Sequence, residues 1–226
     1  ADSAGRADSA GPADSADSAG RGDSTDSAGV GRLLAFTDGV FAIALTILVL
    51  DLDVPPDLAT PELVAALRDQ LPNLFAAALS FAVIGRIWLG HHAVLAHVVR
   101  ADPALLALNT VFLGPLVLLP FVTKLLAEYG DIALAVIAYS ATVDLLLIGL
   151  LALWVCANRS PRTDGRVSRD EFVRRAGGLA GSVAAFTVAV PVALVSPHAA
   201  ILCWLLAIVP VDGLTRRIAA AVDRTA

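Results

Sequence analysis

Long apolar runs separated by short polar connections dominate this chain. The first run, residues 33–50, contains a single charged residue, Asp38. It is ~18 residues long, enough at ~1.5 Å per residue to cross most of a hydrocarbon layer of ~30 Å. Because lipid offers no partner to backbone polar groups, the pattern predicts a membrane-spanning helix.

Five further apolar runs predict five further membrane-spanning helices. Thr60-Pro61-Glu62 is typical of a helix start and predicts a short amphipathic surface helix over 61–71. The polar, arginine-rich residues 157–175 predict a loop. The fold class is therefore all-α: a polytopic membrane protein with six transmembrane helices. Its later spans are expected at 73–98, 103–126, 132–156, 177–195 and 198–219.

The distribution of positive residues sets the orientation of these spans. With the N-terminus in the cytoplasm, thirteen of the 16 Lys and Arg residues lie in inside segments, and only Arg68 and Lys124 lie outside. The positive-inside rule predicts cytoplasmic N- and C-termini and a multi-pass protein of the cell membrane. We divide the chain into a low-complexity tail (1–31), a transmembrane domain (32–220) and a short cytoplasmic tail (221–226).

Composition narrows the function classes. A hydrophobic share of 57% is too high for an ordinary soluble domain. The tail holds six Asp and two Arg, so most of the net charge of −5 lies there, and we expect it to be disordered. The near-neutral remainder gives no reason to expect a nucleic-acid partner.

We expect no cleaved signal peptide. Cys156 and Cys203 lie in apolar runs without zinc spacing, so we expect no metal or cofactor.

Polar side chains recur at matching depths in the first three predicted spans. Asp38, His91 and Asn109 each lie about six residues from the predicted cytoplasmic end of their span, ~9–10 Å deep. Because polar side chains inside a membrane usually face partners, we infer a network that ties these helices together. Its predicted members are Arg32, Thr37, Asp38, Trp88, His91 and Asn109.

Two other functions of these polar side chains stay open. They are direct ion ligation and a His–Asp proton relay that makes gating sensitive to pH.

Arg86 and Asp144 also lie at matching depths, about thirteen residues into their spans, and predict an ion pair with Asp212 as a competing partner. With His91 they define an alternative, the binding site of a secondary transporter, although no internal repeat is visible. Enzyme motifs are absent from the sequence, so we expect no enzyme.

An aliphatic stripe follows the first span, where Ile43, Ile47 and Leu50 recur at four and three residues. Such spacing is ordinarily a packing seam between helices. Two acidic residues, Asp51 and Asp53, follow at the predicted outer end. They either mark the interface or attract cations there.

Three motifs resemble the transmembrane protein 175 family of potassium channels, in its prokaryotic form with a single six-helix repeat. The first span opens with Arg32-x-x-x-Phe36-Thr37-Asp38, with Thr where the family usually has Ser. The second span carries Trp88-x-x-His91-His92. The third span contains Leu105-Leu106-x-x-Asn109, followed by Leu119-Pro120-Phe121. The resemblance is specific over residues 32–128.

The resemblance implies a homotetramer in which four first helices surround a central pore. The main constriction would be Ile43, with further layers at Ile47 and Leu50 and a hydroxyl layer at Thr46. Four copies of Asp51 and Asp53 would form an acidic outer mouth. The permeant ion would be K⁺, with H⁺ as an open alternative. A hydrophobic neck admits ions by size and hydration cost, and the sequence has no T-V-G-Y-G filter, so modest selectivity is expected.

Overall fold

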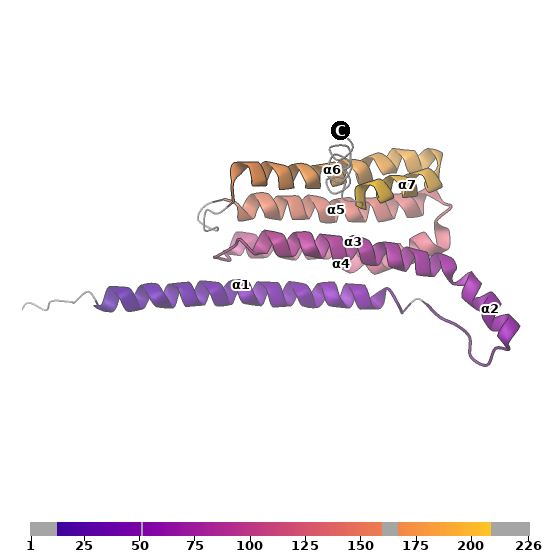
Figure 1. The fold of residues 1–226 in the computed structure, drawn as a ribbon, viewed down its shortest axis with the longest axis horizontal. Helices are drawn as coiled ribbons and strands as arrows, with labels where there is room; N and C mark the ends of the chain where they lie inside the picture. Colours follow the sequence, from indigo (N-terminus) through magenta and orange to yellow (C-terminus); the bar gives the residue numbers. More distant parts are fainter. Residues whose placement is uncertain (1–12, 51, 160–166, 209–226) are drawn as a thin grey trace, which may run out of the picture.

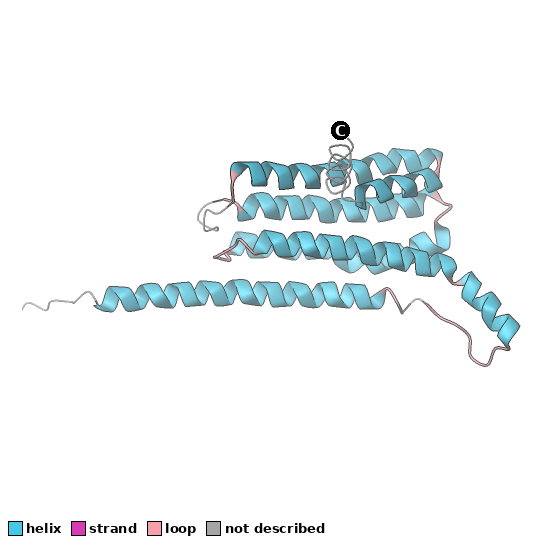
Figure 2. Ribbon diagram, in the orientation of Figure 1, coloured by secondary structure: helices cyan, strands magenta, loops and turns pink. Residues whose placement is uncertain are grey.

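The computed structural model describes residues 13–50, 52–159 and 167–208 of the 226-residue chain. Within these ranges every regular element is a helix (Figure 2). The predicted all-α fold class is therefore confirmed. The helices are α1 (Ala13–Ile47), α2 (Thr60–Asp69), α3 (Leu71–Leu95), α4 (Pro103–Tyr129), α5 (Ala133–Ala157), α6 (Arg169–Val195) and α7 (Pro197–Ile208).

The long helices lie side by side in layers, with α1 on one outer side (Figure 1). Helix α1 packs against α3 and α4, α4 packs against α5, and α6 and α7 cover the far side of α5. Within the described part of the chain, α1 thus has helix partners on only one side. Apolar and aromatic side chains fill the space between the layers. The largest fully buried ones include Trp154, Trp204, Tyr139, Phe41 and Phe112.

Among the described residues, five helices are long and apolar enough to cross a membrane: residues 28–47 of α1, and all of α3, α4, α5 and α6. They correspond to the first five predicted spans. The sixth predicted span, 198–219, starts in α7 and continues outside the described residues. Asp212, the predicted competing partner of Arg86, also lies outside them. The amphipathic helix predicted over 61–71 is α2, which buries none of its residues.

Two helices begin earlier than the sequence pattern predicts. Helix α1 starts at Ala13, inside the tail that we expected to be disordered. An apolar span can extend into an Ala-containing tail because adding a residue to a formed helix is far easier than nucleating one. Helix α6 starts at Arg169, inside the predicted loop 157–175. There Ser168 Oγ accepts a hydrogen bond from the Glu171 amide at 3.2 Å and caps the helix.

Candidate functional site

Three buried side chains connect α1, α3 and α4 through hydrogen bonds. Asn109 Nδ2 donates to Thr37 Oγ1 at 2.9 Å, and Asn109 Oδ1 lies 2.8 Å from His91 Nε2. Because the Asn109 oxygen can only accept, the hydrogen of the second contact is on His91 Nε2. Each residue belongs to a different helix. The two hydrogen bonds therefore fix α1 against the next two spans, as the matching depths predicted.

Aromatic rings surround this contact. The His91 ring stacks on Phe112, with centroids 5.2 Å apart and an interplanar angle of 9°. Phe41 of α1 lies 5.9 Å from the His91 centroid and 6.2 Å from the Phe112 centroid. In such apolar surroundings a hydrogen bond is electrostatically stronger, and an unpaired polar group is costly. The rings thus raise the energetic importance of the Thr37–Asn109–His91 contacts.

The acidic residue of α1 has its own partner on α3. Trp88 Nε1 donates to Asp38 Oδ1 at 2.8 Å, in a partly buried position. The indole also lies beside His92, with ring centroids 5.8 Å apart. A carboxylate inside a membrane span is costly without a partner, and a hydrogen bond to a charged acceptor is among the stronger kinds. The Asp38 side chain therefore points toward α3 of the same chain.

One predicted network member, Arg32, lies elsewhere. Its Nε donates to the carbonyl of Ala28 at 3.4 Å on the exposed side of α1. Arg32 is five residues before Thr37, which places the two side chains roughly 140° apart around the helix. The prediction that Arg32 joins the network is therefore wrong, because helix rotation turns its side chain away from α3 and α4.

A continuous stripe of α1 is exposed on the face opposite these contacts. Its members recur at alternating steps of four and three residues, the 3.5-residue period of helices that pack along a seam. We call this set of residues the α1 stripe. It consists of Arg32, Phe36, Gly39, Ile43 and Thr46 of α1 together with Leu50 in the turn that follows α1, all exposed in the described part of the chain.

The residues predicted to line a pore lie on or beside this stripe. Ile43 is 60% exposed and Leu50 is 77% exposed, whereas Ile47 is 38% exposed and lies at its edge. The Thr46 hydroxyl donates to the carbonyl of Ile43 at 2.9 Å, so its oxygen keeps its capacity to accept a hydrogen bond. Asp53 is exposed in the connection after α1. Asp51 lies outside the described residues.

The predicted ion pair between Arg86 and Asp144 is not formed. Asp144 Oδ2 accepts a hydrogen bond from Thr187 Oγ1 of α6 at 2.9 Å, and Asp144 Oδ1 is buried without a partner among the residues that the structure describes. Arg86 forms no ion pair with any residue in the described ranges. His91 faces α4, so these three residues do not converge on one site. The transporter alternative therefore loses the binding site on which it was based.

The sequence reasoning missed a second level of polar contacts between the helices. Ser80 Oγ of α3 lies 2.7 Å from Thr123 Oγ1 of α4 and 3.1 Å from the Tyr139 hydroxyl of α5. In addition, Trp204 Nε1 of α7 donates to Ser140 Oγ at 3.1 Å. Isolated Ser and Thr residues in apolar runs gave no signal strong enough to single them out. None of these contacts involves α1.

These features define a polytopic helical membrane protein. Its first span is held by buried polar contacts on one face and is exposed on the other face. A family model described as the endosomal/lysosomal potassium channel TMEM175 matches residues 32–120, which include every one of those contacts. A potassium channel of Streptomyces collinus is 39% identical over 162 residues, 67% of this chain and 78% of the relative. This chain belongs to the TMEM175 family.

A solved structure shows the same fold. The crystal structure described as a lysosomal potassium-selective channel TMEM175 homolog from Chamaesiphon minutus matches with a TM-score of 0.70 and 32% identity. The match covers 80% of this chain and 95% of the other. The human endosomal/lysosomal proton channel TMEM175 is 37% identical over 138 residues, 56% of this chain and 27% of the human protein. Because the family is one of ion channels, the chain is not an enzyme.

Proposed function

We propose that four copies of this chain form a potassium-permeable cation channel in the cell membrane, with the α1 stripe around the conduction path. The observation that carries this proposal is the division of α1 into two faces. One face is fixed by Thr37 and Asp38 to α3 and α4, and the other is exposed along the whole span. The names of the relatives support potassium as the permeant ion.

The composition of the exposed face favours contact with other copies of α1. Ala35, Gly39 and Ala42 are small and exposed, and no atom of the described residues lies within 4 Å of the point where a Cβ on Gly39 would be. Small residues let helices in a membrane approach each other closely. Four α1 helices can therefore come together at these positions, with the larger side chain of Ile43 narrowing the space between them.

The arrangement favours a hydrophobic neck rather than a charged filter. Ile43 and Leu50 supply aliphatic side chains, and Asp38 is turned away toward Trp88. A ring of aliphatic side chains gates by dewetting and admits an ion only if its hydration shell can be partly lost. Exposed Asp53 follows α1 and would attract cations to the proposed outer mouth.

Flux through reconstituted protein tests this proposal. The purified chain should exist as a tetramer by light scattering and should pass K⁺ into liposomes down its gradient. Ile43→Asn should wet the neck, raise the K⁺ flux and reduce discrimination against Na⁺. The matched control is Ile148→Asn, which changes an exposed isoleucine of α5 and should leave flux unchanged.

Two results would contradict the proposal. One is intact tetramers that pass neither K⁺ nor Na⁺ under any applied potential. The other is an equal response to Ile43→Asn and Ile148→Asn, which would remove the α1 stripe from the conduction path. Because the human relative is named a proton channel, proton flux is measured in the same liposomes with a pH-sensitive dye. Proton flux that rises with Ile43→Asn together with K⁺ flux would indicate one shared path.

A further inference from the structure

A groove runs along the bundle between α3 and α6, with α5 as its floor. Three adjoining hollows form it. The largest has a volume of about 350 Å³ and the next about 300 Å³. All three are lined by Arg86, and the two largest also share Gly90 and Leu179. Leu89, which lines the groove, is 63% exposed, so the groove opens on the outer surface of the bundle. A pocket of this volume is in the range that binds small ligands.

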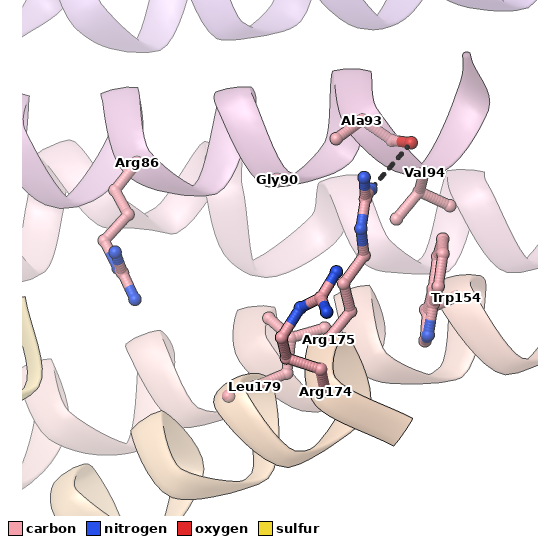
Figure 3. A pocket seen from close by; sticks show the side chains of 9 residues that line it. Arg86, Gly90, Ala93, Val94, Trp154, Arg174, Arg175 and Leu179 are labelled. Atoms are coloured by element: carbon pink, nitrogen blue, oxygen red, sulfur yellow. Dashed lines mark hydrogen bonds between the residues drawn. The ribbon is translucent and has the colours of Figure 1, made fainter. Parts of the chain in front are cut away.

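One end of the groove is strongly basic. Arg174 and Arg175 of α6 line this end, and their guanidinium groups lie between α6 and α3 (Figure 3). Among the residues that the structure describes, no acidic side chain lines any of the three hollows. Arg86 and Arg174 form no ion pair within the described ranges. The groove thus presents two guanidinium groups whose charge no carboxylate of the described chain balances.

Arg175 differs from the other two because it is held in place. Its Nη2 lies 2.7 Å from Glu171 Oε1, and its Nη1 donates to the carbonyl of Ala93 on α3 at 3.4 Å. Its guanidinium also lies over the Trp154 ring, 5.1 Å from the centroid. These contacts join the start of α6 to the end of α3 and α5. Arg175 therefore closes the end of the groove.

Along the groove, Arg175 lies at the depth expected for a lipid head group, and Arg86 lies deeper, in apolar surroundings suited to an acyl chain. Ala93, which Arg175 contacts, lies two residues before the end of α3, at the level expected for lipid head groups. Arg86 lies seven residues earlier on α3, ~10 Å deeper at ~1.5 Å per residue. The walls around Arg86 are apolar and include Leu147, Leu150 and Leu179. An arginine at such a depth is costly without a partner.

From these contacts we infer that the groove binds one anionic phospholipid. Its head-group phosphate lies between Arg174 and Arg86, and an acyl chain follows the apolar wall past Gly90 and Leu179. Guanidinium groups form paired hydrogen bonds with phosphate, and basic pockets between spanning helices take anionic lipid head groups. The inference does not depend on the proposed channel activity, since no described residue of α1 lines the groove.

Native mass spectrometry of the delipidated full chain tests the inference. Phosphatidylglycerol and phosphatidylcholine with identical acyl chains are added to separate samples, and bound lipid per chain is counted. The native chain should retain one phosphatidylglycerol in preference to phosphatidylcholine. Arg174→Gln and Arg86→Gln should each weaken phosphatidylglycerol binding about fivefold, the effect of one basic residue near an anionic lipid. Arg174→Lys should retain most of the binding, which separates lost charge from misfolding.

Two further variants separate the groove from general surface charge. Gly178→Leu should block the site sterically, since no atom lies within 4 Å of a Cβ placed at Gly178. Arg169→Gln removes a positive charge from the same helix outside the groove and should leave binding unchanged. The inference is overturned by equal retention of the two lipids, by full binding to Gly178→Leu, or by equal losses in Arg169→Gln and Arg174→Gln.

Discussion

The Thr37–Asn109–His91 contacts predict a measurable loss when Asn109 is replaced by leucine. Leucine has nearly the same shape but removes both hydrogen bonds, and it leaves the buried donor of His91 without an acceptor. Hydrogen bonds between helices in membranes contribute ~0.6 kcal/mol on average and up to ~1.7. Two such bonds predict that Asn109→Leu lowers the free energy of unfolding by about 1–3 kcal/mol.

The assay is unfolding of the purified chain in mixed micelles titrated with SDS, followed by circular dichroism. A double-mutant cycle with Thr37→Val isolates the bond between α1 and α4, and its coupling energy should lie near ~0.6–1.7 kcal/mol. The fraction of chains in the proposed tetramer is measured on the same samples. It should fall with Asn109→Leu, because the position of α1 depends on this contact.

Ser80→Ala provides the matched control. It removes buried hydrogen bonds to Thr123 and Tyr139 at a level that does not involve α1. It should lower the free energy of unfolding while leaving the tetramer fraction unchanged. The reasoning is refuted if Asn109→Leu changes neither quantity, or if the coupling energy with Thr37→Val is zero. It is also refuted if Ser80→Ala dissociates the tetramer as strongly as Asn109→Leu.

Two other substitutions give opposite expectations for two acidic residues. Asp38→Asn keeps an oxygen for Trp88 Nε1 but removes the charge, so it should reduce tetramer yield more than the K⁺ flux per tetramer; normal tetramers without flux would show that Asp38 acts in permeation. Asp144→Leu removes a buried carboxylate of which one oxygen has no partner among the described residues, so the melting temperature should be unchanged or higher. A clearly lower melting temperature would mean that the Asp144–Thr187 hydrogen bond is needed.

Much of the fold could be predicted because the bilayer restricts the choices. An apolar run of spanning length must be a helix in lipid, and the described part of the chain agrees for five spans. The Thr37–Asn109–His91 contacts were predictable for a related reason. Residues counted from the span ends give depth directly, and a polar side chain in lipid needs a partner at its own depth.

Rotation about the helix axis could not be obtained from depth. Arg86 and Asp144 were assigned similar depths, yet Asp144 faces Thr187 on α6. The prediction also placed Arg32 in the network, although it lies on the exposed side of α1. Which face of a helix meets which neighbour depends on the packing of all the helices at once. A single sequence carries only a weak signal for that arrangement.

The sequence contains a capping signal for the early start of α6, but the prediction gave more weight to the charged residues of this segment. Ser168-Arg169-Asp170-Glu171 has the Ser-x-x-Glu pattern of a capped helix start, and Ser168 indeed caps α6. The many charged residues around it favoured a loop instead. The pattern of capping residues was the better guide here, because the first turn of a helix leaves its amide groups free for such side chains.

The central claim is that the α1 stripe surrounds the path of the ion, and chemical modification at Ile43 tests it most directly. In a chain with Cys156→Ala and Cys203→Ala, K⁺ current across a planar bilayer is recorded before and after a charged thiol reagent is added to Ile43→Cys. The account predicts that modification blocks most of the current, while Ile148→Cys on α5 gives no change. Current through Ile43→Cys that is unaffected by a completed modification would contradict it.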